Sequence, residues 1–389
     1  MSELKEISRR ARALRAGGQP ALVATLVAVQ GSSYRRPGAR LLIDCTGVAA
    51  GSVSGGCLER DLARRGWWHT AGGGPALVTY DSTDDDDGLG DRIGLGCNGV
   101  VDILIERLSP DSAGGSAFDF IERCLSAEAR GVLVTVFRST DPAVPAGTWV
   151  GLGAADASPA GNTDHPDLLT AAGRLRQTLE RTAVVSLRKG ACQALAEVIE
   201  PPPHLFLLGT GPEAPPLVAQ AVALGWSTTV WDCRARFETR ARFATADHVR
   251  MGPLAGLLAA VDRSARAAAL VMAHDFDRDR EALATLLGSK ARYVGVLGPR
   301  RRTERLLAEI AGAPGAPIDV QADGLARLYA PAGLSIGAES PAEIALSIAS
   351  EIETVLTGES IGHLRNRPGA IHRRPAISAA PPLAAAGDR

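Results

Sequence analysis

Apolar and polar residues alternate along the first part of the chain with the periods of short helices and strands. Residues 4–16 carry apolar side chains at the spacing of a helix face. Apolar runs at 21–29 and 40–44 predict strands, and the stretch 34–38, which ends in Pro-Gly, predicts the turn between them. The same criteria predict a helix at 58–68 and strands at 76–80 and 100–108. We therefore expect a mixed α/β N-terminal domain over residues 1–110.

The stretch that follows, 111–200, has a weaker pattern. It predicts a helix at 118–129 and strands at 132–137 and 183–187, whereas the Pro-, Gly- and Asp-rich part at 140–166 is typical of a loop. We expect a middle α/β segment that packs with the N-terminal domain. We find no internal repeat in the sequence.

Three prolines at 201–203 mark the clearest linker, because proline extends neither a sheet nor a helix. The order strand, glycine turn, helix and strand follows at 204–232, and further apolar runs alternate with helical stretches. This alternation predicts a Rossmann-like, doubly wound parallel sheet over residues 201–360. The tail at 361–389 is rich in Ala, Pro and Arg and is expected to be disordered.

Composition and charge exclude several classes of protein. The chain has 389 residues, of which 46% are hydrophobic and 22% are charged, and its formal net charge is −1. Such a chain is expected to be globular, and its near-neutral charge argues against a nucleic-acid or membrane-surface binder. It lacks an apolar run of membrane-spanning length and the residue order of a secretory signal, so we expect a cytoplasmic protein. The six cysteines show no zinc-ligand spacing and are interpreted as reduced thiols.

The Ser- and Gly-rich stretch at 51–56 is the first candidate site. Ser54, Gly55 and Gly56 expose backbone N–H groups and tolerate positive φ, so this loop can form a nest that binds an anion. The residues after it have a helical pattern, which places Cys57 at a helix N-terminus, where the pKa of a thiol falls. A tight turn with a small buried cysteine explains the same pattern equally well.

A second glycine-flanked cysteine, Cys97, leads directly into a predicted strand. Two such loops in one domain suit a ligand that combines a soft metal or sulfur with a phosphate. Arg35 and Arg36 offer two guanidinium groups to a phosphate, although a basic turn facing solvent is an equally good explanation. Four adjacent aspartates at 84–87 are typical of a solvated run.

The turn Gly209-Thr-Gly211 stands between a predicted strand and a predicted helix, which is the context of a dinucleotide-binding fingerprint. Asp232 ends the next strand, at the position of an acid that binds a ribose. At the helix entrance, however, Pro212 removes a donor and the carboxylate of Glu213 competes with a pyrophosphate. The pattern therefore favours a Rossmann-like unit more strongly than it favours NAD.

Two further candidates, His274 and Arg300, follow predicted strands of the same sheet. The carboxyl ends of parallel strands bind ligands, so a shared cleft is expected there. A structural histidine and a solvated helix start are the alternative explanations.

Several motifs occur along the chain in one order: Gly31-Ser-Ser-x-Arg35, Ser54-Gly-Gly-Cys57-x-Glu59, Gly94-Leu-Gly-Cys97, Gly209-x-Gly211, Asp232-x-Arg234, His274-Asp275 and Gly298-x-Arg300. In this set and order the chain resembles the XdhC/CoxI family, bacterial accessory proteins that mature molybdenum hydroxylases. The resemblance covers nearly all of residues 20–355.

The resemblance implies a chaperone without turnover of its own, which binds molybdenum cofactor in its molybdopterin or dinucleotide form. Such a protein protects the cofactor while a cysteine desulfurase installs its terminal sulfur, and delivers it to the large subunit of a hydroxylase such as xanthine dehydrogenase or carbon monoxide dehydrogenase. We expect Cys57 and Cys97 to hold the metal end, and the Rossmann-like domain to hold the phosphate or nucleotide end. The residues expected to bind the cofactor are Arg35, Ser54, Gly55, Gly56, Cys57, Glu59, Cys97, Gly209, Gly211, Asp232, His274 and Arg300.

The sequence alone is also compatible with two other functions. One is an NAD(P)-dependent oxidoreductase that uses Asp232 for the ribose and His274 as general acid–base. The other is an assembly scaffold whose pockets have lost their ligands. Accessory proteins of this kind often form homodimers, but no stretch of the sequence marks an interface.

Overall fold

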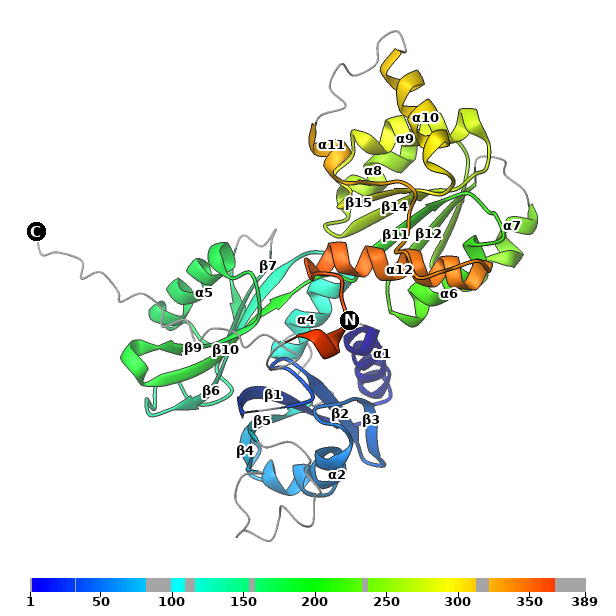
Figure 1. Cartoon of the computed structure of the whole chain (residues 1–389). Coiled ribbons are helices and arrows are strands. Elements are labelled where there is room, and N and C mark those ends of the chain that lie inside the picture. Colours follow the sequence, from blue (N-terminus) through cyan, green and yellow to red (C-terminus); the bar gives the residue numbers. More distant parts are fainter. Residues whose placement is uncertain are drawn as a thin grey trace, which may run out of the picture. The chain divides into compact units, whose positions relative to one another are not determined.

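The structure, a computed structural model, describes residues 2–31, 33–81, 99–108, 116–153, 158–232, 237–312 and 322–367. The chain forms two compact units, one over residues 3–200 and one over residues 201–366 (Figure 1). Among the helices in the described ranges, none combines the length and the hydropathy that a bilayer span requires.

The first half of residues 3–200 is an antiparallel five-stranded sheet covered by two helices. Its elements are α1 (Ser2–Ala16), β1 (Ala21–Gly31), β2 (Arg40–Asp44), β3 (Gly47–Gly51), α2 (Cys57–His69), β4 (Ala76–Asp81) and β5 (Gly99–Leu108). The strands lie in the order β3-β2-β1-β5-β4. Alternate residues of β1 pack against Ile7 and Ala11 of α1 or against Leu58 and Leu62 of α2. Burial on both faces explains the long apolar run of β1, in which Thr25 is the only polar residue between Ala21 and Val29.

The second half contains another antiparallel sheet with the same topology. Its elements are α4 (Ala117–Ser126), β6 (Gly131–Ser139), β7 (Trp149–Gly153), β8 (Ala160–Gly161), α5 (Pro166–Thr178), β9 (Ala183–Leu187) and β10 (Cys192–Ile199). The strands lie in the order β8-β7-β6-β10-β9, which matches the first sheet strand for strand. The sequence shows no repeat, but the structure does.

The prediction of a loop over residues 140–166 is wrong, because β7 and β8 lie within it. Every residue of β7 is buried. Its glycines, which suggested a loop, make room for neighbouring side chains: a Cβ on Gly151 would lie 2.6 Å from the ring of Phe120 on α4. Glycine is therefore needed at this strand position by packing rather than by a turn.

Residues 201–366 form a doubly wound parallel sheet, as predicted. Its elements are β11 (His204–Leu208), α6 (Ala214–Ala223), β12 (Ser227–Asp232), α7 (Phe237–Arg242), β13 (His248–Met251), α8 (Ala255–Arg263), β14 (Ala267–Val271), α9 (Phe276–Leu287), β15 (Tyr293–Val296), α10 (Arg300–Gly312), α11 (Ala322–Ala326), β16 (Leu328–Tyr329) and α12 (Pro341–Thr357). The parallel strands lie in the order β13-β12-β11-β14-β15-β16, so the strand order reverses between β11 and β14. A Rossmann-like sheet binds its ligands at this reversal.

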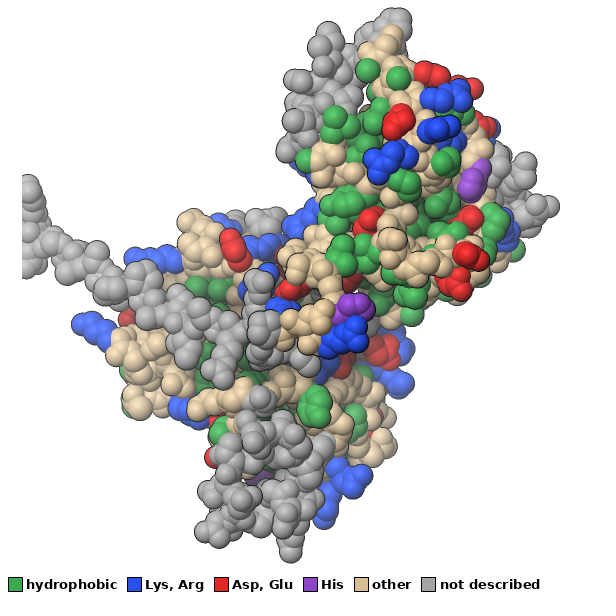
Figure 2. All heavy atoms as spheres, in the orientation of Figure 1, with side chains coloured by type: hydrophobic (Ala, Val, Ile, Leu, Met, Phe, Trp, Pro, Cys, Tyr) green, Lys and Arg blue, Asp and Glu red, His purple; other side chains and the backbone are tan. Residues whose placement is uncertain are grey.

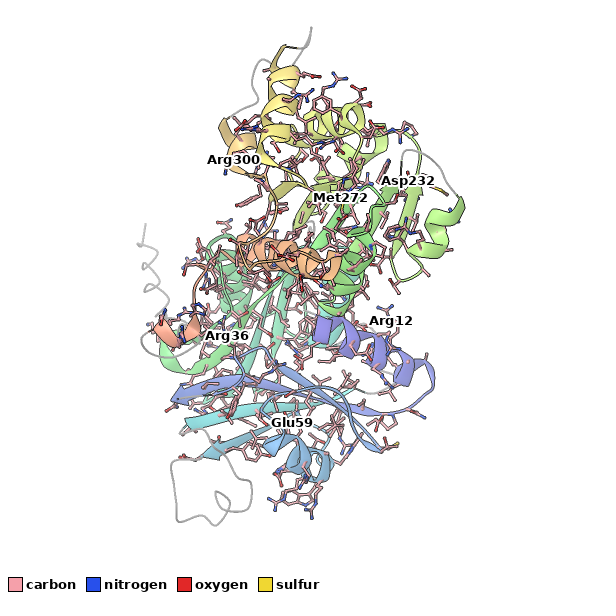
Figure 3. The ribbon with its side chains drawn as sticks, turned by 45° about the vertical axis from the view of Figure 1, so that its right-hand side comes forward. Arg12, Arg36, Glu59, Asp232, Met272 and Arg300 are labelled. Carbon is pink, nitrogen blue, oxygen red and sulfur yellow. The ribbon has the colours of Figure 1, made fainter. Side chains whose placement is uncertain are left out.

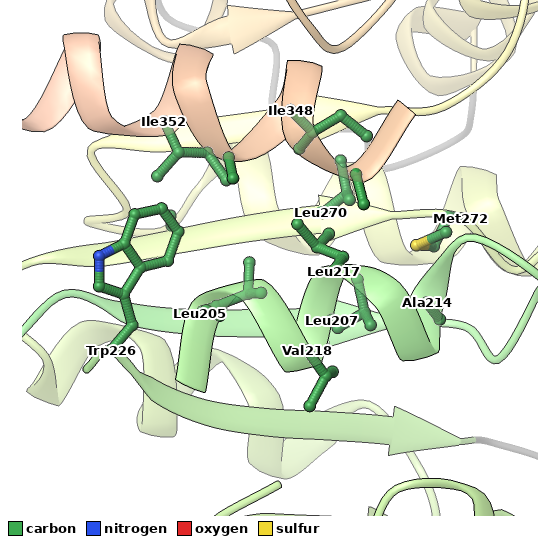
Figure 4. Close-up of a cluster of buried hydrophobic side chains, with 14 of the residues drawn as sticks. Leu205, Leu207, Ala214, Leu217, Val218, Trp226, Leu270, Met272, Ile348 and Ile352 are labelled. Atoms are coloured by element: carbon green, nitrogen blue, oxygen red, sulfur yellow. The ribbon is translucent and has the colours of Figure 1, made fainter. Parts of the chain in front are cut away.

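Helices cover both faces of this sheet. On one face α6 and α12 pack over Leu205, Leu207 and Leu270 (Figure 4). On the other face α8, α9 and α10 cover Phe206 and Val271. The predicted capping box that opens α12 is present, since the side chain of Ser340 accepts a hydrogen bond from the backbone N–H of Glu343 and the glutamate side chain accepts one from the backbone N–H of Ser340.

A buried ion pair links the two sheets of the first unit. Arg40 on β2 contacts Glu197 on β10 at 2.6 Å, and their side chains are 6% and 3% exposed. Glu106 on β5 lies near both charges. Burial and the carboxylate of Glu197 raise the pKa of Glu106 to about 7, although Arg40 acts to lower it. Arg40 is therefore close to two carboxyl groups and forms its ion pair with Glu197. Its charge does not fully offset the cost of burying an ionised Glu106.

We predict that Glu106→Gln stabilises the chain at pH 8 by about 1–2 kcal/mol and has little effect near pH 4.5. The unfolded chain ionises Glu106 near its ordinary pKa of 4.5 and the native chain near 7, so native stability falls as the pH rises between these values. Urea denaturation at both pH values measures the difference. Glu180→Gln, at an exposed position, is the control. Equal effects of the two variants at pH 8 contradict the prediction.

Candidate functional site

The loop before α2 is folded around the carboxylate of Glu59. Its Oε1 accepts hydrogen bonds from the backbone N–H groups of Val53 and Ser54, at 3.0 and 2.8 Å, and from Ser52 Oγ at 2.8 Å. Its Oε2 accepts a hydrogen bond from Ser54 Oγ. That hydroxyl oxygen in turn accepts hydrogen bonds from two N–H groups at the start of α2, both at 3.2 Å.

The loop does bind an anion through backbone N–H groups, but these belong to Val53 and Ser54, and the anion is the chain's own carboxylate. Burial acts to raise the pKa of Glu59, and the hydrogen bonds from Ser54 and Ser52 outweigh burial and hold that pKa below its ordinary value. Gly56, with φ of 114°, turns the chain from the loop into α2. Of the loop N–H groups expected to bind a phosphate, those of Ser54 and Gly56 are already paired, so Glu59 positions the loop.

A small pocket lies beside this loop. It is lined by Ser33, Tyr34, Val53, Ser54, Leu58, Tyr80, Gly99 and Val101. Ser54 and Leu58 flank Cys57 in the sequence, and Gly99 is the second residue after Cys97. Residues close in sequence to both candidate cysteines thus line a single pocket.

The two cysteines are described only in part. Cys57 is the first residue of α2, as predicted, but its side chain lies outside the described part of the structure. Cys97 and the aspartates at 84–87 lie outside it entirely. Within the described part, no group of three or more His, Cys, Asp or Glu residues is placed to hold a metal ion.

The side chain of Arg35 fastens the β1–β2 connection to two neighbouring segments. Its Nε donates to the carbonyl oxygen of Ser52 at 3.2 Å, and its guanidinium forms an ion pair with Glu3 on α1. Gly55 lies against the ring of Tyr34: a Cβ added to Gly55 would be 3.7 Å from the nearest atom of that ring. Arg35 therefore holds the rim of the pocket in place.

Packing requires the first glycine of the Rossmann turn, and the second lies close to a neighbouring side chain. Gly209 has φ of 128°, and a Cβ there would lie 2.3 Å from the carbonyl oxygen of Met272. A Cβ on Gly211 would lie 2.8 Å from Nε2 of His274. The turn is thus pressed against the connection that follows β14.

The first turn of α6 has no free donor for a pyrophosphate. Pro215 and Pro216 have no N–H group. The N–H of Ala214 donates to Gly211, and that of Leu217 donates to Glu213, both at 3.2 Å. The dinucleotide fingerprint is present in the turn, but the phosphate-binding amides of the helix are absent or already paired.

His274 faces the start of α6 from the neighbouring connection. Its φ of 57° is unusual for a residue with a side chain. The flanking residues hold it there, because Ala273 N–H donates to Asp279 Oδ1 and the side chain of Asp275 caps α9. His274 Nε2 lies 3.6 Å from Glu213 Oε2. The structure therefore brings together Gly211, Glu213 and His274.

Asp232 and Arg300 lie apart. Asp232 ends β12 and is 3% exposed, and it lines a second pocket with Gly209, Ala273 and Asp279. Arg300 follows β15, and two strands separate β12 from β15, which places the strand ends roughly 14 Å apart. Figure 3 shows the two residues on opposite sides of Met272. Acidic and basic side chains are interspersed over the visible face of this unit (Figure 2).

Comparison with known protein families identifies both units. A model described as the XdhC and CoxI family matches residues 14–81, and one described as the XdhC Rossmann domain matches residues 205–352. The chain belongs to the XdhC/CoxI family.

Relatives support this XdhC/CoxI assignment over most of the chain. A Bacillus subtilis protein, named as a probable subunit of xanthine dehydrogenase, is 29% identical over 343 residues, which cover 86% of this chain and 92% of that protein. The Escherichia coli uncharacterized protein YqeB is 29% identical over 187 residues, covering 48% of this chain and 32% of that protein. A crystal structure described as a xanthine dehydrogenase from Bacillus halodurans matches with a TM-score of 0.70 and 28% identity, covering 91% of this chain and 97% of that one.

Sequence reasoning missed the floor of the XdhC/CoxI pocket. Leu58, Tyr80 and Val101 are apolar or aromatic residues of regular elements, and nothing in their sequence context separates them from ordinary core positions. They are 2%, 5% and 7% exposed, so they are core residues that also border the pocket. The glycines at 51–56 were the only local signal.

We predict that Glu59→Ala destabilises the first unit by about 2–4 kcal/mol, because it leaves the buried N–H of Val53 and its neighbour without an acceptor. Hydrogen exchange of residues 52–58 should accelerate in the variant. Glu59→Gln keeps one acceptor oxygen and should lose less stability. Stability and exchange equal to those of the unmodified chain would show that the carboxylate does not organise this loop.

Proposed function

We propose that this chain is an accessory protein that binds molybdenum cofactor, protects it during sulfuration and delivers it to a molybdenum hydroxylase. The family membership and the name of the Bacillus subtilis relative support xanthine dehydrogenase as the class of client. The observation that carries the proposal is the pocket beside α2, because its lining includes residues close in sequence to both Cys57 and Cys97.

The residues of this pocket suit such a ligand. Tyr34, which is 65% exposed, offers an aromatic ring at the edge of the pocket, and the hydroxyl group of Ser33 provides a polar contact. When bound, the cofactor supplies a molybdenum centre with sulfur ligands, which matches the preference of thiolates for soft metals. We assign Cys57 and Cys97 to that end of the ligand.

The chain's own contribution is to hold this ligand in place and shield it. Glu59 keeps the loop that precedes Cys57 in one conformation, and Arg35 fixes the neighbouring connection. We propose a cysteine desulfurase and the large subunit of the hydroxylase as successive partners. A protein that only stores and transfers the ligand needs neither a general base nor a hydride acceptor of its own.

The alternative, an NAD(P)-dependent oxidoreductase, has less support. Asp232 ends β12 beside a pocket, and His274 faces Glu213, which favours some ligand at this edge of the sheet. The first turn of α6, however, has no free N–H for a pyrophosphate, and Glu213 places a negative charge there.

The cofactor proposal predicts that the chain copurifies with pterin from a host that makes molybdenum cofactor. Cys57→Ala should lower the pterin content at least tenfold and Cys97→Ala severalfold, because each removes a soft ligand. Released pterin is measured by its fluorescence after oxidation.

Cys45→Ala is the matched control, since Cys45 is an exposed free cysteine away from the pocket lining. It should keep the full pterin content. Absence of pterin from the unmodified chain, or full retention by both Cys57→Ala and Cys97→Ala, contradicts the proposal. Activation of the client by the double variant would instead support a scaffold without a ligand.

The structure of α6 also predicts that NAD binds no more tightly than roughly millimolar, since pyrophosphate recognition depends on free amides at the helix start. Isothermal titration of the unmodified chain and of Asp232→Ala should show the same weak binding. Micromolar affinity that is abolished in Asp232→Ala would establish the oxidoreductase alternative instead.

A further inference from the structure

The outer side of α2 carries a tryptophan that the fold leaves in solvent. The five tryptophans of the chain all lie in the described ranges, and four of them are buried or partly buried. Trp68, in the last turn of α2, is 73% exposed, and no other large apolar side chain in those ranges is as exposed. An indole ring in water forgoes the large apolar contact area that it could bury against another surface.

The packing of α2 on its sheet fixes the outward position of Trp68. A Cβ on Gly66 would lie 2.9 Å from Leu22 Cδ1, so the helix runs close to β1 at this residue. Trp67 packs against the core cluster on that face, and Arg107 on β5 lies 5.5 Å from the centre of its ring. Since successive residues of a helix point in different directions, the residue after Gly66 and Trp67 faces away from the sheet.

Two arginines extend this outer side toward the start of the helix. Arg60, Arg64 and Trp68 follow one another at a spacing of four residues, so they lie on one side of α2, and all three are exposed. Within the ranges that the structure describes, neither arginine forms an ion pair, whereas the neighbouring Arg65 pairs with Asp61 at 3.2 Å. Like charges one turn apart weaken a helix. The three residues, called the α2 stripe below, thus combine an exposed ring with unbalanced positive charge.

The corresponding helix of the second sheet lacks this combination. The two sheets have the same strand order, and α5 stands in the second where α2 stands in the first. Leu168 and Ala172 are buried on α5 at the spacing that Leu58 and Leu62 have on α2. The exposed positions of α5 that match the α2 stripe are Thr170, Arg174 and Thr178. A helix in this place therefore folds without a tryptophan and without a second arginine on its outer side.

The chemistry of the α2 stripe defines the partner that it fits. Tryptophan and arginine are enriched among the residues that dominate the energy of protein interfaces. An exposed ring beside two guanidinium groups fits a protein face where carboxylates border an apolar depression. A second copy of this chain is a poor match, because a two-fold axis through the stripe would bring arginines against arginines.

The position of the stripe on α2 connects it with the candidate site. The helix begins at Cys57, and Trp68 lies about 17 Å further along its axis. A protein interface of ordinary size covers about 800 Å² on each partner, which is wide enough to span this distance. A protein that covers the α2 stripe therefore also reaches the end of the helix where Cys57 stands.

We propose that the α2 stripe is the docking surface for the large subunit of the client hydroxylase, whose contacting face is acidic and receives the ring of Trp68. The inference rests on the proposed function for the identity of this partner. Delivery moves a whole cofactor between two proteins, so the acceptor needs one orientation relative to the start of α2. A ring seated in a depression fixes that orientation, and the arginines steer the acidic face toward it.

Binding of the large subunit tests the proposal. The probe is the large subunit of the same organism's xanthine dehydrogenase, purified from a host that makes no molybdenum cofactor, and biolayer interferometry measures its affinity for the full chain. Trp68→Thr, which introduces the residue found on α5, should weaken binding roughly tenfold or more. Arg60→Glu combined with Arg64→Glu should do the same and should remove most of the salt dependence of the association rate. All variants should melt within about 2 °C of the unmodified chain.

Arg174→Glu is the matched control, because it reverses an exposed arginine at the corresponding position of α5. Its affinity for the large subunit should stay within about twofold of the unmodified value. The inference is overturned if the unmodified chain does not bind the large subunit, if the α2 variants bind it as tightly as the unmodified chain, or if Arg174→Glu weakens binding as much as they do.

Other occupants of the stripe give different results, each with an unchanged affinity for the large subunit. Weaker binding of a cysteine desulfurase to the α2 variants would assign the stripe to that enzyme. A dimer of the unmodified chain that dissociates in Trp68→Thr, measured by sedimentation, would assign it to a second copy. Nucleic acid that copurifies with the unmodified chain and is lost from the double arginine variant would assign it to nucleic acid. Each of these results overturns the inference.

The pterin content of the same preparations separates this inference from the proposed function. The α2 variants keep Cys57 and Glu59, so they should retain as much pterin as the unmodified chain. Full pterin retention with an unchanged affinity for the large subunit would reject the docking surface and leave the cofactor role standing. Absence of pterin from every preparation, with binding still weakened by Trp68→Thr, would keep the docking surface and reject the cofactor role.

Discussion

The candidate site depends on one carboxylate that the chain supplies to itself. Glu59 accepts hydrogen bonds from two backbone N–H groups and two serine hydroxyls of the loop before α2. Without an acceptor these donors would be buried and unpaired, and the loop would have no reason to adopt one conformation. This interaction fixes the loop from which α2 begins, and it shapes one wall of the pocket. Cys57 is the first residue of α2, so its backbone position depends on the same interaction.

The chain also places a carboxylate of its own at the start of α6, where a Rossmann fold binds pyrophosphate. There Glu213 makes no capping hydrogen bond and instead faces His274 at 3.6 Å. A pattern that marks an ion-binding loop therefore does not reveal whether the ion comes from outside. Only the contacts of the charged side chain distinguish the two cases.

Much of the fold could be predicted from hydrophobic periodicity. The helices at the start of the chain and after the Pro-rich linker, and the parallel sheet with its glycine turn, are regular elements whose apolar faces repeat over many residues. The strand β7 could not be predicted, because the glycine at position 151 is required by the ring of Phe120, which is distant in sequence and leaves no room for a Cβ. The internal repeat was hidden for the same reason: matching turns such as those at Gly38 and Gly147 share backbone geometry but few side chains.

The sequence by itself determined the alternation of elements, the Rossmann-like half and the glycine loops that mark the first site, because these follow from local propensity and local backbone freedom. Tertiary structure alone decided how the two sheets of residues 3–200 meet, through Val27, Leu104, Phe137 and Leu195. That outcome depends on side chains far apart in the sequence coming together in one buried cluster. Such long-range packing leaves no periodic signal in the chain, since each residue involved looks like an ordinary core or surface residue until its neighbours are in place.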